Sequence, residues 1–277
     1  MTINSAEDYP SLEKLANRIR KHVIEMTHRG NSSHVGTSFS MVELLVVLYE
    51  DILNIRPSDP KWEDRDRFIL SKGHGCAALY AVLAEKGYFP LEWLETYYLD
   101  GSPLPGHATS SVPGVEVSTG SLGHGLSIAN GMALTSKRDR AEWRVFTVLS
   151  DGECDEGSIW EAALFAGNHA LDNLTVIVDY NKIQALGHTE DVLDLEPLSD
   201  KWKSFGWEVR EIDGHNLLEV QETLESVPFI SGKPNCIIAH TIKGKGVSFM
   251  EDELLWHYRS PQGTEYEDAL NELGGME

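Results

Sequence analysis

The sequence has 277 residues, of which 41% are hydrophobic, so it is long enough for one large α/β domain or two small ones. Its 44 acidic and 23 basic residues give a net charge of −21, a balance that repels nucleic acid and anionic membranes. No apolar run reaches the length that spans a bilayer, and the polar N-terminus lacks the features of a signal peptide, so we expect a cytoplasmic protein.

The N-terminal part of the chain predicts helices. Apolar residues recur at helical spacing from Leu12 to Met26, which predicts an amphipathic helix over about 11–29. A second helix is expected over 41–53, with Ser40 as its N-cap.

Farther along, short apolar runs alternate with helical patterns. The runs are β-branched and mostly apolar throughout, as strands buried on both faces are, and they lie at 67–70, 145–149, 174–179, 208–212 and 236–241. Helices are expected near 75–87, 123–137, 157–170, 196–205 and 216–226. This alternation predicts a doubly wound, mainly parallel sheet flanked by helices. We expect a single domain over residues 1–277, with a helical N-terminal lead-in and a C-terminal tail.

Polar and glycine-rich segments follow four of the predicted strands. They are the segments 71–75, 150–153, 180–183 and 242–246. Ligands of open α/β sheets bind outside the carboxyl ends of the strands, so four such segments together favour a binding site at that edge.

Asp151 and Asn181 are the first candidates for a metal site. Each residue follows a predicted apolar strand, and the segment between the two strands is predicted to form one helix. The two strands are therefore expected to be neighbours that are joined by a right-handed crossover. Carboxylate, amide and carbonyl oxygens are hard ligands suited to Mg²⁺ or Ca²⁺, with phosphate oxygens completing the octahedron.

These residues resemble the G-D-G…N signature of thiamine-diphosphate enzymes, and the surrounding sequence resembles transketolases. Six further motifs agree in order: N-S-S-H-V-G (31–36), L-S-K-G-H-G (70–75), P-G-H (105–107), S-T-G-S-L-G-H-G (118–125), T-I-K-G-K-G-V-S-F-M (241–250) and W-H (256–257). The resemblance runs from about residue 12 to about residue 260. It implies the thiamine-diphosphate-binding fold of the domain that holds the diphosphate.

The resemblance also implies which residues hold the cofactor and its metal ion. Asp151, Asn181 and the backbone oxygen of Ile183 would bind Mg²⁺, for which Ca²⁺ or Mn²⁺ could substitute. The diphosphate and the rest of the cofactor would be bound by Gly120, Leu122, Gly152, Glu153, Lys243 and His74. Backbone N–H groups of Gly120 and Leu122 at a helix N-terminus, together with the ion and a few cations, would offset the acidic background.

The resemblance implies catalytic roles for four histidines and two glutamates. His34, His74, His107 and His257 match active-site histidines, which would donate hydrogen bonds to the sugar and move protons near neutral pH. Glu156 and Glu161 match carboxylates at the subunit interface of the family. His124 also lies between glycines. For this residue, the resemblance gives equal weight to a contact with the cofactor and to no contact.

Two positions depart from the family pattern. Ser150 replaces the first glycine of the signature, a position that mainly requires a small residue, so metal binding should survive. Tyr258 follows His257 where many members have glycine, and it is expected to narrow the substrate cleft.

A larger departure is the absence of the domain that holds the aminopyrimidine ring and supplies the glutamate that protonates it. We therefore expect a separate C-terminal subunit, an α2β2 assembly, and transfer of a two-carbon ketol unit between a ketose or its phosphate and an aldose or its phosphate.

Other hypotheses about the function remain open. Another enzyme of the superfamily, such as a 1-deoxyxylulose-5-phosphate synthase-like or 2-oxoacid-decarboxylating subunit, would turn over pyruvate. A non-catalytic cofactor-binding subunit would bind without activity. A zinc hydrolase is disfavoured because no H-E-x-x-H spacing occurs. The three cysteines, Cys76, Cys154 and Cys236, form no C-x-x-C pair and are expected to be reduced and buried.

Overall fold

A parallel sheet forms the centre of the structure, a computed structural model that describes residues 9–274. The strands within these residues are β1 (Arg67–Leu70), β2 (Val145–Ser150), β3 (Leu174–Tyr180), β4 (Glu208–Asp213) and β5 (Asn235–His240). They form one five-stranded sheet in the order β1-β2-β3-β5-β4, and every neighbouring pair is parallel. The predicted doubly wound parallel sheet is confirmed, and β2 and β3 are the adjacent strands that the sequence predicted.

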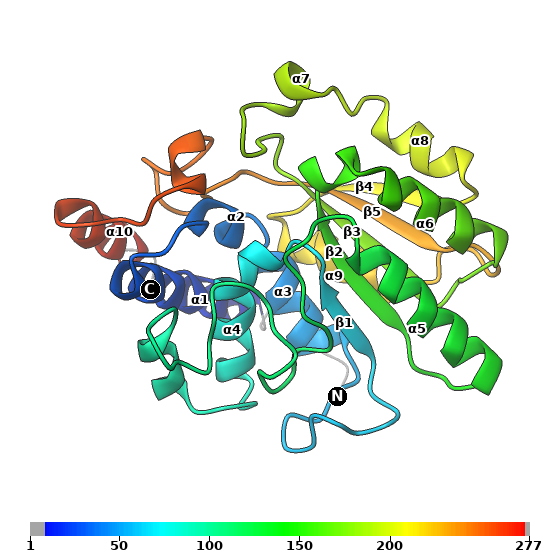
Figure 1. The fold of residues 1–277 in the computed structure, drawn as a ribbon, viewed down its shortest axis with the longest axis horizontal. Helices are drawn as coiled ribbons and strands as arrows, with labels where there is room; N and C mark the ends of the chain where they lie inside the picture. The colour runs from blue at the N-terminus through cyan, green and yellow to red at the C-terminus, as the bar shows by residue number, and fades with distance from the viewer. Residues whose placement is uncertain (1–8, 275–277) are drawn as a thin grey trace.

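Helices cover both faces of the sheet because alternate strand residues point to opposite sides. On one side, Phe146, Val148 and Ile237 pack with α1 (Tyr9–Gly30), α3 (Val42–Val47), α4 (Cys76–Glu85) and α9 (Leu217–Glu225). On the other side, Val176, Val178 and their neighbours pack with α5 (Gly125–Asp139), α6 (Gly157–Asn168) and α8 (Leu198–Ser204). Figure 1 shows α5 and α6 on one side of the strands and α1 and α4 on the other. The cysteines are buried and unpaired, as expected.

The second predicted helix differs from the expectation in its start and its end. Residue 40 lies after a short helix, α2 (Val35–Phe39), and α3 then begins with Met41 at its N-cap position and without a side-chain cap. The helix continues into a single π-helical turn, η1 (Leu48–Ile52). The N-cap role predicted for Ser40 is wrong, because its hydroxyl donates instead to the Asp179 carboxylate, 2.6 Å away, a charged acceptor within the core.

The predicted C-terminal tail contains a helix, α10 (Thr264–Gly274), whose Ala269 and Leu273 are buried. It packs against α1, where Asn17 Nδ2 donates to the carbonyl of Leu273 at 2.5 Å. The remaining elements are short: η2 (Gly73–Gly75), η3 (Leu91–Thr96), η4 (Gly152–Asp155), α7 (Thr189–Val192) and η5 (Leu254–His257). No helix among the described residues is long and apolar enough to cross a membrane. The single domain over 1–277 stays a prediction, and its ends, 1–8 and 275–277, lie outside the described residues.

Candidate active site

A cavity of about 260 Å³ opens at the carboxyl ends of the strands. The segments that follow β1, β2, β3 and β5 all contribute to it, as the sequence predicted from the polar residues after these strands. Its lining residues are His34, Thr37, His74, His107, Gly120, Leu122, Ser150, Asp151, Gly152, Asn181, Ile183, Gln184, Ala185, Lys243 and His257. The structure therefore brings together most of the residues that the sequence singled out.

Asp151 is buried at the end of β2, and both of its carboxylate oxygens accept backbone hydrogen bonds. Oδ1 accepts from Gly152 N at 2.7 Å and Oδ2 from Lys182 N at 2.6 Å. Lys182 adopts a φ of 66°, an uncommon conformation for a residue with a side chain. Burial, with the nearby Asp179 carboxylate second, raises the pKa of Asp151 to about 6. A buried carboxylate with so raised a pKa is a group that a cation would stabilise.

Asn181 and Ile183 follow β3 and place two more oxygens beside Asp151. Asn181 Oδ1 accepts from Ile183 N at 3.2 Å, and the carbonyl of Ile183 accepts from Lys243 Nζ at 2.6 Å. The described residues hold no cluster of three or more His, Cys, Asp or Glu side chains that could bind a metal. One carboxylate, one amide oxygen and one carbonyl oxygen are instead the hard donors that Mg²⁺ takes together with phosphate oxygens. The donor set therefore fits the predicted ion.

Lys243 donates to one of these oxygens, the Ile183 carbonyl, and it is almost completely buried. Besides the Ile183 carbonyl, its Nζ lies 3.0 Å from Nδ1 of His257. Burial, opposed by the Asp151 charge, lowers the pKa of Lys243 to about 8. The ammonium thus balances the Asp151 charge inside the cavity.

Four imidazole rings face one another across the cavity. The ring centroid of His34 lies 5.2 Å from that of His74, 6.0 Å from His107 and 5.1 Å from His257. Burial, with the charges of nearby cationic groups, lowers the pKa of His34 to about 4 and of His257 to about 3. The pKa of His74 is also lowered well below its ordinary value, mainly by burial. These three rings are therefore neutral at pH 7, and each has an unprotonated nitrogen that can accept a hydrogen bond.

Gly120 and Leu122 line the cavity just before α5, whose first residue is Gly125. Gly120 has a φ of 157°, and a Cβ there would lie 3.2 Å from the His107 ring, so glycine permits a close approach between this loop and the imidazole. A Cβ added at Gly152 would lie 2.9 Å from the side chain of Gln184, so the absence of a side chain also allows a close contact at this position.

Glu153, predicted from the resemblance to contact the cofactor, is not among the residues that line the cavity. Its carboxylate is fully buried and accepts from Ser71 Oγ, from Gly123 N at 2.8 Å and from Ser150 N at 3.3 Å. These donors turn it toward the loop before α5. Glu153 therefore ties that loop to the ends of β1 and β2.

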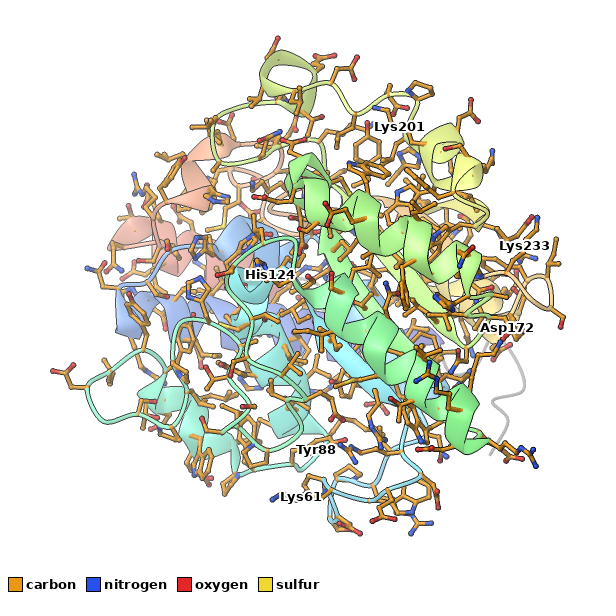
Figure 2. All side chains as sticks on the ribbon, turned by 45° about the vertical axis from the view of Figure 1, so that its right-hand side comes forward. Lys61, Tyr88, His124, Asp172, Lys201 and Lys233 are labelled. Carbon is orange, nitrogen blue, oxygen red and sulfur yellow. The ribbon has the colours of Figure 1, made fainter. Side chains whose placement is uncertain are left out.

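Three other predicted residues are exposed and lie outside the cavity lining: Glu156, Glu161 and His124. The two glutamates lie at the start of α6 and one turn along it. His124 lies at the surface just before α5 (Figure 2), where its Nδ1 is 3.0 Å from the carbonyl of Leu122.

Tyr258, at 56% exposure, donates its hydroxyl to the carbonyl of Ala185, a residue of the cavity lining. This bond joins the segment that contains His257 to the loop after β3. The side chain is thus at the margin of the cavity, where the sequence expected a narrowing.

Sequence reasoning missed the buried ion pair beneath the cavity. Lys72 Nζ donates to the Asp179 carboxylate, and both side chains are fully buried. The sequence held a signal for this pair, since a lysine follows β1 and a charged aspartate lies within the mostly apolar β3. Thr37, Gln184 and Ala185, which also line the cavity, carried no such signal.

Comparisons with known proteins agree with this geometry. The sequence profile described as "Transketolase, thiamine diphosphate binding domain" matches residues 11–274. The chain is 46% identical over 269 residues to the 6-deoxy-6-sulfo-D-fructose transketolase subunit of a Clostridium species, covering 97% of this chain and 98% of the relative. It is 42% identical over 263 residues to one subunit of the apulose-4-phosphate transketolase of Phocaeicola vulgatus, covering 95% of this chain and 94% of that subunit.

A solved structure also resembles this chain. The transketolase of Campylobacter jejuni matches with a TM-score of 0.90 and 33% identity, over 95% of this chain and 42% of that one. The chain thus spans under half of the Campylobacter jejuni transketolase chain but nearly all of the two relatives that are named as transketolase subunits. With its match to the family profile over residues 11–274, this chain belongs to the transketolase family and corresponds to the subunit that carries the thiamine-diphosphate-binding domain.

Proposed function

We propose that this transketolase subunit transfers a two-carbon ketol unit from a ketose or its phosphate to an aldose or its phosphate, in the cytoplasm and together with a separate partner chain. The observation that carries the proposal is one cavity that is lined both by four neighbouring imidazoles and by Asp151, Asn181 and Ile183. Oxygen donors suit a divalent ion with a diphosphate, and imidazoles suit proton transfer at a sugar.

Asp151, the amide oxygen of Asn181 and the carbonyl of Ile183 would hold Mg²⁺, or Ca²⁺ or Mn²⁺ in its place. Lys243 donates to the Ile183 carbonyl at 2.6 Å, so the ion would have to displace this ammonium from that oxygen. The displaced Lys243 stays within the cavity, where the diphosphate offers a new acceptor. Gly120, Leu122 and Gly152 line the same cavity, as does His74, whose Nε2 lies 3.5 Å from Thr37 Oγ1.

Breaking a ketose C2–C3 bond requires a base for the C3 hydroxyl and later an acid for the acceptor carbonyl. Thiamine diphosphate would supply the electron sink, a task that no side chain performs. His34 and His257 have pKa values lowered to about 4 and about 3, so they enter the reaction neutral and can exchange hydrogen bonds with sugar hydroxyls.

The partner chain would dock on the exposed face of α5 and α6 to form an α2β2 assembly. Ile128, Leu164 and Phe165 are 37%, 57% and 39% exposed on this face, beside Glu161. A Cβ added at Gly131 or Gly157 would meet nothing within 4 Å, so another chain has room to approach both helices closely. Exposed apolar residues gathered on neighbouring helices mark interaction surfaces.

The test combines this chain with a subunit that carries a pyrimidine-type domain. Ketol transfer is measured with apulose-4-phosphate and 6-deoxy-6-sulfo-D-fructose, the sugars in the relatives' names, and with other phosphorylated ketoses as donors. We expect transfer only when both chains, thiamine diphosphate and Mg²⁺ are present. Robust transfer by this chain alone would contradict the need for a partner. Turnover of pyruvate without ketol transfer would favour the hypothesis of a 2-oxoacid-decarboxylating or 1-deoxyxylulose-5-phosphate synthase-like subunit. Cofactor binding without turnover in any pairing would favour the hypothesis of a non-catalytic cofactor-binding subunit.

A further inference from the structure

Asp179, the one aspartate of β3, is completely buried and accepts hydrogen bonds from four different side chains. Its Oδ2 accepts from Ser40 at 2.6 Å, from Asn181 Nδ2 at 3.2 Å and from Lys72 Nζ, and its Oδ1 accepts from Thr241. Lys72 Nζ also donates to the carbonyl of Thr37 at 3.0 Å. The chain has thus placed an ion pair in the sheet interior, where replacement by apolar residues is often neutral or even stabilising.

The contact with Asn181 has a chemical consequence. An amide has one oxygen and one NH₂ group, and a half-turn about its terminal bond exchanges them. The Asp179 carboxylate accepts a hydrogen bond from the NH₂ group of Asn181, so the amide oxygen of Asn181, Oδ1, must point the other way. There Oδ1 accepts a hydrogen bond from Ile183 N at 3.2 Å. Only the oxygen can bind a cation. A partner that accepts from Nδ2 therefore selects the amide orientation that metal binding requires.

The remaining contacts of Asp179 reach other walls of the cavity. Ser40 belongs to the segment that carries Thr37, and Thr241 precedes Lys243 by two residues. The charge of Lys72 allows a carboxylate, the strongest acceptor among side chains, to remain ionised while fully enclosed.

We propose that Asp179, neutralised by Lys72, is a positioning residue that sets the Asn181 amide for divalent-ion binding and holds three walls of the cavity in register. This inference rests on the proposed function, since it concerns the ion that the function requires. Asp179 itself would not touch the ion, because its oxygens face Ser40, Thr241, Lys72 and the NH₂ group of Asn181.

Two double variants separate positioning from stability. Lys72→Met with Asp179→Val removes both charges and the acceptor, whereas Lys72→Met with Asp179→Asn removes both charges and retains an acceptor oxygen. A matched control, Asp66→Val with Arg144→Met, removes a pair whose atoms lie 2.7 Å apart just before β1 and β2, at the opposite edge of the sheet.

The full chain is titrated with Mg²⁺ by calorimetry at saturating thiamine diphosphate, with and without the partner subunit, and thermal unfolding is followed separately without ligands. We expect the Asp179→Val variant to lose about 10- to 100-fold in Mg²⁺ affinity, the range for residues that orient a metal ligand, and the Asp179→Asn variant to retain most of it. The control should keep the wild-type affinity whatever its melting temperature.

Equal Mg²⁺ affinities for the wild type and the Asp179→Val variant would overturn the inference and leave the proposed function intact. Equal losses in both Asp179 variants would also overturn it, because the acceptor oxygen would then not matter. A wild-type chain that binds no thiamine diphosphate with Mg²⁺, alone or with its partner, would refute the proposed function and the inference together.

Discussion

Acidification from pH 7.5 to pH 5 should weaken divalent-ion binding by about tenfold through one carboxyl group, Asp151. Burial, with Asp179 second, raises the pKa of Asp151 to about 6 in the metal-free chain. Above pH 6 the carboxylate is ionised and available, and below it a proton competes with the ion. Each pH unit below 6 therefore costs about a factor of ten in affinity, or about 1.4 kcal/mol.

The assay is calorimetry of Mn²⁺ binding at saturating thiamine diphosphate over this pH range. The titration of the cofactor phosphates is measured in the free Mn²⁺ complex and subtracted. At pH 6, binding to the wild type should release about half a proton from Asp151, seen as a dependence on the ionisation heat of the buffer. The Asp151→Asn variant should bind more weakly and lose this release. An affinity that stays constant between pH 7.5 and pH 5 after correction would refute the assignment of the ion to Asp151.

Three further outcomes are expected. The pKa values of His34 and His257 are lowered to about 4 and about 3 from 6.5, so these two rings bind fewer protons in the folded metal-free chain than in the unfolded chain, and the stability that they contribute is lost as pH falls below 6.5. Urea unfolding at several pH values should show a shallower loss in His257→Asn than in the wild type. Leu164→Asp on α6 should weaken partner binding by more than about tenfold in sedimentation or calorimetry, with little change in the melting temperature, because Leu164 is 57% exposed. Tyr258→Phe removes the bond to the Ala185 carbonyl and should change KM for the acceptor more than kcat, at a stability cost of about 1 kcal/mol or less; an unchanged KM would exclude Tyr258 from the substrate path.

Four strands, β1, β2, β3 and β5, were predictable because they are almost wholly buried and mostly apolar. β4 was also predicted, although it lies at the edge of the sheet, is partly exposed and carries Glu208, Arg210 and Glu211. β2 and β3 are buried at every position, and their predicted bounds differ from the observed ones by one residue. α10 was missed although Tyr266, Ala269, Leu270 and Leu273 carry its helical spacing. The error at Ser40 has another cause. An N-cap is a local contact, whereas the acceptor that Ser40 uses lies on β3, far away in the sequence.

The site was predictable where chain topology alone brings residues together. Parallel strands end at one edge, so Asp151 and Asn181 had to be neighbours once β2 and β3 were adjacent. The Lys72–Asp179 pair joins β1 to β3 across the intervening β2, and its formation depends on side-chain direction rather than on strand order. Glu153 shows the same limit. It lies two residues after Asp151, yet its carboxylate turns to Gly123 N.

The charges inside the site argue for a divalent ion independently of the sequence motifs. Lys72 neutralises Asp179, Lys243 balances Asp151, and His34, His74 and His257 are neutral at pH 7. The cavity wall therefore offers no net positive charge to a diphosphate, and the chain as a whole carries −21. A highly charged anion that enters such a site must bring its own cation, because backbone N–H groups and one lysine offset only part of its charge. With Mg²⁺ on the oxygens of Asp151, Asn181 and Ile183, Lys243 would become available to the phosphates. The same step that binds the ion would thus supply the second cation.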